Sequence, residues 1–266
     1  MTTITASLVK ELRDQTGAGM MACKEALQET SGDLEAARTL LREKGMAAAG
    51  KRADRATTEG LVGVIVEPEV ASIVGLGCET EPVSRNEAFQ AFGERVLRAI
   101  HAEGAGAVES LEPARTELIA QLGENIVVVE PTRLEGGTLA AYVHPPAWKI
   151  GVLVQLEGGS EELARQLAMH ISFAAPQYLT SDDVPADVLA AERQIYLNTD
   201  EVQSKPEQAR EKIVDGMLGK RFFAAAPGGA LAEQAWIHDA SQTVGKALEA
   251  AGARVTAFAR VSVAGS

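Results

Sequence analysis

The chain has 266 residues, 46% hydrophobic and 23% charged, which is the composition of a folded globular protein rather than a disordered one. Its formal net charge of -12 disfavours broad binding to nucleic acid or to anionic membranes, because an acidic surface repels phosphate groups. Two cysteines and four histidines, without CxxC or metal-ligand spacing, predict neither a disulfide framework nor a metal site. The chain shows no signal-peptide pattern and no run of apolar residues long enough to cross a membrane, so we expect a cytoplasmic protein.

Residues 1–46 are expected to form a small amino-terminal module of three helices. Thr5 is positioned to cap the first helix, and a glycine-bearing turn at 16–19 separates it from the second, at 20–29. Asp33 is expected to cap the third helix, and Gly45 to end it as the residue just past its carboxyl end. A helical module of this size is typical of a binding domain.

Residues 47–59 are expected to form a linker or a frayed helix. Lys51 and Arg52 lie in it, in a chain that is otherwise acidic. A solvated positive surface explains such residues in most proteins, and contact with an acidic partner is the alternative.

From residue 60 onward, the order of the predicted elements repeats. Each copy contains two strands, then helices, then a third strand, which predicts two small antiparallel sheets backed by helices and therefore an α+β fold. The first copy spans 60–136, with strands at 61–66, 71–77 and 125–129 and helices near 86–102 and 113–122. The second copy spans 137–180 and 224–266, with strands at 139–143, 150–154 and 255–263 and helices near 161–173 and 242–251.

Residues 181–223 interrupt the second copy with two strongly helical stretches, opened by Pro185 and Pro206. An insertion of this form predicts a projecting helical hairpin, similar to a coiled coil. Its apolar stripe either holds the two helices together or also meets a partner, including a second copy of the chain.

The strand at 71–77 leads into a short polar segment that contains Thr80, Glu81 and Pro82. Ser84 is expected to cap the helix that follows, with Glu87 three residues later completing a capping box. The segment is therefore predicted to be an exposed tip between a strand and a helix. Considered locally, an ordinary strand-to-helix turn is the more common explanation of such a segment.

The sequence contains none of the familiar catalytic patterns, including GxSxG, HExxH, the P-loop and the dinucleotide fingerprint. We therefore expect a binding or regulatory protein without a cofactor, rather than an enzyme. The alternative is an enzyme whose site assembles in space from dispersed carboxylates and His170. His170 lies on an otherwise apolar helix, where a hydrogen-bonded core histidine is the common situation and a partner contact the alternative.

Several segments together resemble the bacterial elongation factor Ts family, in the order in which that family has them. Residues 8–13 (LVKELR) and 16–24 (TGAGMMACK) resemble its amino-terminal signature. Further resemblances lie at 55–60 (RATTEG), 78–83 (CETEPV), 123–126 (GENI), 150–154 (IGVLV), 168–171 (AMHI) and 212–216 (KIVDG). The resemblance covers essentially the whole chain.

This resemblance implies a guanine-nucleotide exchange factor for elongation factor Tu (EF-Tu), a GTPase of protein synthesis. Such a factor binds the GDP form, disturbs its magnesium site, promotes GDP release and stabilises the nucleotide-free GTPase until GTP binds. The resemblance also implies an amino-terminal module like a ubiquitin-associated domain. It implies a hairpin that can support a homodimer, and it implies neither a nucleic-acid nor a membrane partner.

Matched to the family, Thr80, Glu81, Pro82 and Val83 would dislocate the magnesium ion. The family usually has Thr-Asp-Phe-Val there, so Glu81 keeps the acid whereas Pro82 replaces the aromatic side chain. An EF-Tu-binding module with weak exchange activity is therefore the alternative. The other contacts that the resemblance implies are Met20, Met21, Lys24, Lys51, Arg52, Ile150, Gly151 and His170.

Overall fold

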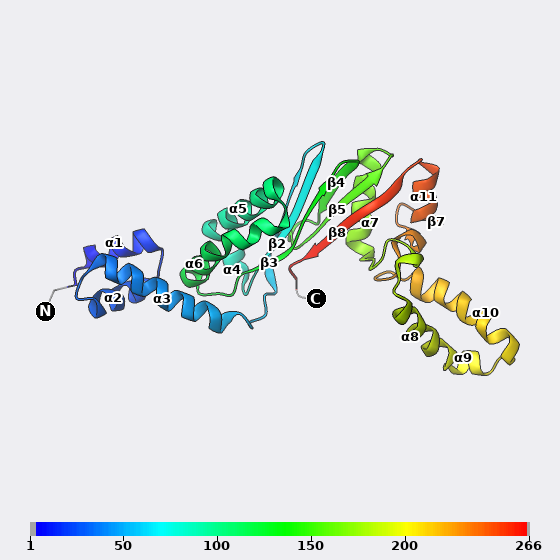
Figure 1. The fold of residues 1–266 in the computed structure, drawn as a ribbon, viewed down its shortest axis with the longest axis horizontal. Coiled ribbons are helices and arrows are strands. Elements are labelled where there is room, and N and C mark those ends of the chain that lie inside the picture. The colour runs from blue at the N-terminus through cyan, green and yellow to red at the C-terminus, as the bar shows by residue number, and fades with distance from the viewer. Residues whose placement is uncertain (1–3, 265–266) are drawn as a thin grey trace.

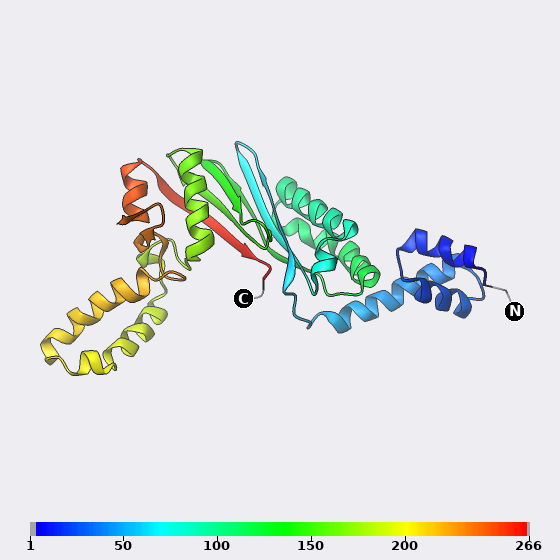
Figure 2. The same cartoon turned by 180° about the vertical axis from the view of Figure 1, so that it is seen from behind.

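The computed structural model describes residues 4–264 and shows an elongated molecule of helices and small sheets (Figure 1). A helical module forms one end, two sheets lie in the middle and a helical hairpin projects at the other end, as the reverse view also shows (Figure 2). The predicted α+β class is confirmed. Residues 1–3 and 265–266, the outer ends of the first and last predicted segments, lie outside the described residues. Among residues 4–264, no helix is both long and apolar enough to span a bilayer.

Three helices make up the amino-terminal module: α1 (Ala6–Thr16), α2 (Met20–Glu29) and α3 (Leu34–Arg52). The two predicted caps are confirmed, since Thr5 accepts a hydrogen bond from the Leu8 amide at 3.2 Å and Asp33 accepts one from the Ala36 amide at 3.0 Å. The helices enclose a small apolar core. Its buried members are Val9, Leu12, Cys23, Ala26, Leu27 and Ala37.

Helix α3 does not end at Gly45, so the predicted stop there is wrong. The helix continues to Arg52, and the first part of the expected linker is therefore helical. Gly45 lies where α3 crosses α6 (Glu112–Leu122), and a Cβ atom at this position would lie 2.4 Å from the Cβ of Ala120. The glycine is needed for close approach of two helices rather than for a left-handed backbone. The contact joins the amino-terminal module to the core.

The core contains two antiparallel sheets of three strands, as the repeat of elements predicts. In each sheet, the second strand of the copy lies in the middle and pairs with both of the others. The first sheet consists of β1 (Glu59–Val66), β2 (Val70–Cys78) and β3 (Val127–Glu135). The second consists of β4 (Thr138–Val143), β5 (Ile150–Glu157) and β8 (Arg254–Ser262).

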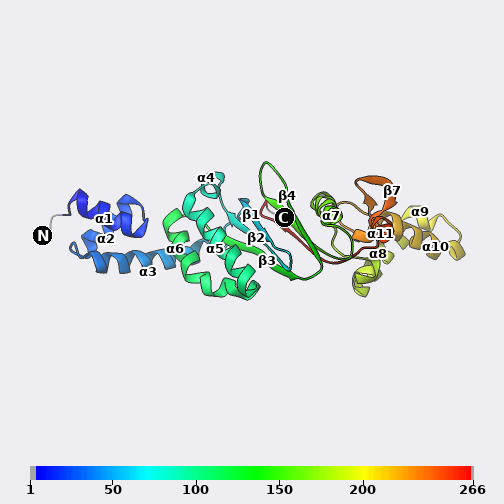
Figure 3. The same ribbon diagram turned by 90° about the horizontal axis from the view of Figure 1, so that it is seen from above.

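The two sheets pack face to face, and helices cover their outer faces (Figures 1 and 3). Helices α5 (Glu87–Glu103) and α6 cover the first sheet, whereas α7 (Glu161–Ala174) and α11 (Val244–Ala250) cover the second. Alternate residues of a strand point to opposite faces, so β2 and β5 are buried on both sides. Gly151 of β5 lies at the sheet interface, where a Cβ would meet Val62 at 2.5 Å.

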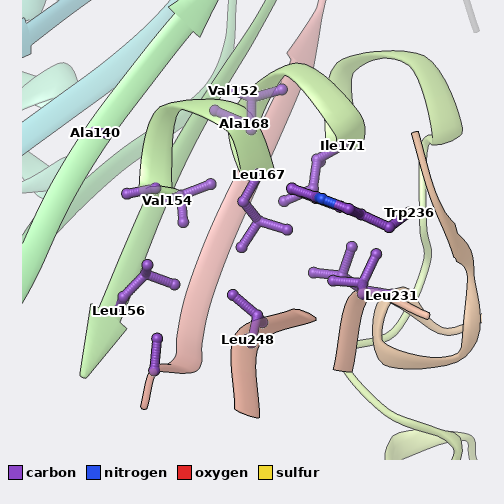
Figure 4. Packing of buried hydrophobic residues seen from close by; sticks show 13 residues of the cluster. Ala140, Val152, Val154, Leu156, Leu167, Ala168, Ile171, Leu231, Trp236 and Leu248 are labelled. Carbon is purple, nitrogen blue, oxygen red and sulfur yellow. The ribbon is translucent and has the colours of Figure 1, made fainter. Parts of the chain in front are cut away.

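Figure 4 shows the core beneath the second sheet. Leu167, Ala168 and Ile171 of α7 lie between β5 and the segments that carry Leu231, Trp236 and Leu248. Trp236 belongs to β6 (Ala235–Trp236), which pairs with β7 (Asp239–Thr243) in a small sheet that the sequence did not predict. The core of the second copy is therefore completed by the chain that returns from the inserted hairpin.

The insertion is a projecting hairpin, with α8 (Ala186–Leu197) and α10 (Glu207–Met217) as its arms and α9 (Asp200–Gln203) at its far end (Figure 1). A π-helical segment, Leu218–Phe223, follows the second arm. Most of the apolar stripe holds the hairpin together, around buried Val202, Val214, Met217 and Leu218. Ile195 instead points outward and is 58% exposed.

Replacing Gly45 with alanine is expected to loosen α3 from α6, because the new Cβ would clash with Ala120. Overpacking of this kind costs about 1–3 kcal/mol. Gly50 is the matched control, since it lies in the same helix and a Cβ added to it would have nothing within 4 Å. Gly50→Ala should stabilise α3 by about 0.5–1 kcal/mol through helix propensity. Amide hydrogen exchange over residues 43–52 and 113–122 would measure both effects, and equal stabilisation by the two variants would contradict the close contact.

Candidate functional site

The predicted tip is a single helical turn at the end of the central strand β2. Thr80 has an extended backbone and precedes the turn α4 (Glu81–Ser84), with Pro82 near its start, where no backbone N–H is required. Glu81 and Pro82 are exposed, whereas Val83 packs against the core cluster of α5. In the view from above, α4 lies at the edge of the molecule (Figure 3). The strand therefore presents an acidic, proline-containing turn to solvent.

Ser84 does not cap the following helix, contrary to the expectation. Its hydroxyl instead donates to the Glu81 carbonyl at 2.7 Å, within α4. Asn86 caps α5 by accepting from the amides of Ala88 at 2.8 Å and Phe89 at 3.4 Å. The turn therefore ends before α5 begins, and α5 has a cap of its own.

The carboxylate of Glu124 holds the base of the tip. One of its oxygens accepts from the backbone amides of Glu79 and Thr80, each at 3.0 Å. The other accepts from the Thr80 hydroxyl at 2.5 Å. Glu124 follows directly on the end of α6, where Gly123 turns the chain with a left-handed φ of 77°. A charged acceptor shared by three donors fixes the direction in which the chain leaves the sheet.

We call Glu124, with the three hydrogen bonds that it accepts from Glu79 and Thr80, the Glu124 clamp. A second carboxylate, that of Glu79, bonds back to the segment that carries Glu124. It accepts from the Asn125 amide at 2.7 Å. The Asn125 side chain is buried and donates to the carbonyls of Ala53 at 3.2 Å and Arg55 at 2.9 Å. The tip is thereby tied to the segment that follows α3. Sequence reasoning did not assign a role to Glu124 or Asn125, although both lie in the segment 123–126 that contributes to the resemblance.

The exposed acid of the tip, Glu81, is paired within the chain. The Glu81 carboxylate lies 2.5 Å from the Arg85 guanidinium, and both side chains are well exposed. Burial, reinforced by the nearby Glu124 carboxylate, raises the pKa of the Cys78 thiol to about 12, so this thiol stays protonated. Within residues 4–264, no group of three or more histidine, cysteine or acidic side chains is placed to hold a metal ion.

The amino-terminal candidates form a second exposed group. Met20 and Met21 are 57% and 64% exposed in the first turn of α2, and Lys24 is exposed one turn later. At the end of α3, Lys51 is exposed and Arg52 is half-buried. Helices α2 and α4 lie apart along the molecule, with α3 running between them (Figure 1). The structure therefore does not bring the predicted residues into one site.

The remaining candidates are mostly internal. Gly151 is buried at the interface of the two sheets and Ile150 is half-buried beside it. His170 is 1% exposed. In the free chain, Gly151 and His170 are therefore packed inside the protein, and their contact with a partner stays a prediction.

His170 joins α7 to the segment that returns from the hairpin. Its Nε2 lies 3.0 Å from Oε1 of buried Gln234, and its ring stacks on Trp236 with 5.3 Å between centroids. The Gln234 amide nitrogen donates to the carbonyls of Ala174, Ala225 and Gly228, so its oxygen faces the imidazole and accepts from Nε2–H. Burial lowers the pKa of His170, which favours this neutral form.

Replacing Glu124 with alanine is expected to release the tip, because the amides of Glu79 and Thr80 lose their shared acceptor. Hydrogen exchange at these two amides should accelerate, with a loss of about 1–2 kcal/mol in local stability. Glu109→Ala removes an exposed carboxylate elsewhere and serves as the control. Unchanged protection of the two amides in Glu124→Ala would show that the clamp does not hold the tip.

The lowered pKa of His170 predicts a stability that depends on pH. Below a pH of about 6.5, the unfolded chain binds a proton at this residue more readily than the folded chain does, so the free energy of unfolding falls as the solution is acidified. His170→Gln should be less stable at neutral pH, but its stability should decline less between pH 8 and pH 5. Urea unfolding followed by tryptophan fluorescence would measure this, and parallel pH profiles would contradict the assignment.

Comparison with known proteins places these features in a family. The family model described as "Elongation factor TS" matches residues 79–265, from the base of the tip to the end of β8 and beyond. Elongation factor Ts of Idiomarina loihiensis is 42% identical, over 98% of this chain and 91% of the relative. The proteins of the same name from Photorhabdus laumondii and Clavibacter michiganensis are 42% and 43% identical, each over 99% of this chain and over 93% and 99% of their own lengths. The chain therefore belongs to the elongation factor Ts family of protein-biosynthesis factors.

Proposed function

We propose that this protein is a guanine-nucleotide exchange factor for EF-Tu, acting in the cytoplasm without covalent chemistry of its own. It binds the GDP form of the GTPase, disturbs the magnesium site and promotes GDP release. It then stabilises the nucleotide-free GTPase until GTP binds. The observation that carries the proposal is the exposed turn Glu81–Ser84, held by the Glu124 clamp at the end of a buried strand.

A rigid acidic tip is suited to this task because magnesium bridging to a phosphate is a strong electrostatic interaction. A group that shifts the surroundings of the metal by a small distance weakens nucleotide binding considerably. Glu81 is the charged side chain at the tip, and it is well exposed. In the free chain its carboxylate is paired with Arg85, so contact with the GTPase must compete with that ion pair.

Exchange follows from the coupling of two ligands on one GTPase. If the factor weakens GDP binding, GDP weakens binding of the factor by the same amount. Each tenfold loss of GDP affinity requires about 1.4 kcal/mol of contacts that are stronger in the nucleotide-free state. The Glu124 clamp supports such coupling because a mobile tip would adjust its own conformation on contact, whereas a fixed tip forces the GTPase to change its conformation.

The exposed Met20, Met21 and Lys24 of α2 are the proposed second contact with the GTPase, and Lys51 and Arg52, at the end of α3, are further proposed contacts. Helix α3 and its close contact at Gly45 hold this surface at a set distance from the tip. Two contacts on one rigid body bind more tightly than either does alone, because the second forms within the complex. A homodimer through the hairpin remains a separate prediction, for which the exposed Ile195 is a candidate contact.

The alternative is a protein that binds EF-Tu but exchanges nucleotide weakly. It is favoured by Pro82, which is exposed where the family usually has an aromatic residue. Release of fluorescent GDP from EF-Tu, with and without this protein, separates the two. The proposal predicts faster release that increases with the concentration of the protein. Complex formation at an unchanged release rate would leave only the binding alternative.

Pro82→Phe is expected to accelerate GDP release at saturating protein, because an exposed aromatic ring adds contacts beside the acid. Glu81→Ala is expected to slow release, since it removes the charge that disturbs the magnesium site. Stopped-flow measurement of the release rate for both variants tests the two contributions separately. A loss with Glu81→Ala and no gain with Pro82→Phe would assign the effect to the acid and the backbone.

A further inference from the structure

A groove of about 840 Å³ lies beside the tip. Its first wall comes from the tip and the start of α5, through Glu81, Arg85 and Gln90. Its opposite wall is the loop between β4 and β5, through Trp148 and Lys149. The edge strand β1 contributes to the floor between them. The groove is therefore continuous with the surface on which the proposed function depends.

Trp148 is the prominent side chain of this groove. The residue is 51% exposed, and its backbone φ of 56° lies in the left-handed region that side chains of this size rarely adopt. Its amide donates to the His144 carbonyl at 3.1 Å, and its carbonyl accepts from the Val62 amide of the edge strand at 2.8 Å. The loop therefore holds a large aromatic residue at the surface in one backbone conformation.

The charged groups around the groove are already paired. Lys149 lies 2.6 Å from Glu59, and Arg85 lies 2.5 Å from Glu81. Glu94, also on the rim, lies 2.7 Å from Arg98 on the next turn of α5. A charged segment entering the groove would have to break one of these pairs. An uncharged, apolar segment would instead cover the indole ring without disturbing them.

We propose that Trp148 is an aromatic anchor for the GTPase. An uncharged, apolar segment of the GTPase would occupy the groove and cover the indole ring, next to the part of the GTPase that residues 80–83 contact. The inference rests on the proposed function, because the GTPase is chosen for its contact with the adjoining tip. Tryptophan residues that become fully covered on binding contribute strongly to affinity in protein interfaces. Trp148 thus adds affinity and specificity beside the tip, whereas Glu81 acts on the magnesium site.

The first test is the affinity of the full-length protein for nucleotide-free EF-Tu. Trp148→Ala should weaken binding at least tenfold, mainly through faster dissociation, and Trp148→Phe should weaken it less. Val66→Ala is the control, because Val66 is exposed at the end of β1 away from the groove. Its affinity for EF-Tu should stay within about twofold of that of the wild type. At saturating concentration, Trp148→Ala should still accelerate GDP release, because the tip is intact.

The second test observes the contact directly. The chain has two tryptophans, and Trp236 is 5% exposed, so 5-fluorotryptophan labelling supplies one surface resonance and one core resonance for fluorine NMR. Trp148→Phe identifies the surface resonance. Complex formation should shift that resonance and remove its response to solvent deuterium, while the Trp236 resonance changes little.

The outcomes distinguish this inference from the proposed function. If the wild type accelerates GDP release, yet Trp148→Ala binds as tightly and the Trp148 resonance does not change, the anchor is refuted and the exchange function stands. If the wild type neither binds EF-Tu nor accelerates release, both are refuted. Loss of affinity in Trp148→Ala together with the NMR change would support the anchor.

Discussion

The burial of strand β2 on both faces is the constraint on which the proposed functional surface depends. One face packs against the second sheet and the other against α5, so the strand has no freedom to shift along its length. The chain that leaves this strand is then held by Glu124, which receives three hydrogen bonds from Glu79 and Thr80. A short turn that would move freely on an edge strand is here directed by the core of the protein.

The same core positions the other surfaces. The contact of Gly45 with Ala120 places the amino-terminal module, and the Asn125 side chain ties the segment after α3 to the base of the tip. At the far end, Gln234 and His170 connect the root of the hairpin to α7. The elongated shape is thus made of modules joined by small, specific contacts, and the proposed function requires separate surfaces held at fixed spacings in this way.

Much of this fold could be predicted from the sequence, because its main signals are local. Central strands buried on both faces appear as continuous apolar runs, and Thr5 and Asp33 cap their helices by contacts three residues away. The failures involve residues whose roles are set by distant partners or by a competing local bond. Gly45 has the sequence context of a glycine at a helix end, and only its contact with Ala120 shows that it lies inside the helix. Ser84, three residues before a glutamate, has the sequence pattern of a capping box, but its hydroxyl bonds to Glu81 instead. The Glu124 clamp and the exposure of Trp148 also depend on contacts between distant segments.

The measurement that tests the proposed mechanism most directly is a pair of binding constants: the affinity of this protein for EF-Tu without nucleotide and for EF-Tu saturated with GDP and magnesium. Isothermal titration calorimetry can measure both. The mechanism predicts markedly tighter binding to the nucleotide-free form, by the same factor by which the protein weakens GDP binding. Equal affinity for the two forms would contradict it, because a ligand that binds both states equally cannot shift the equilibrium between them.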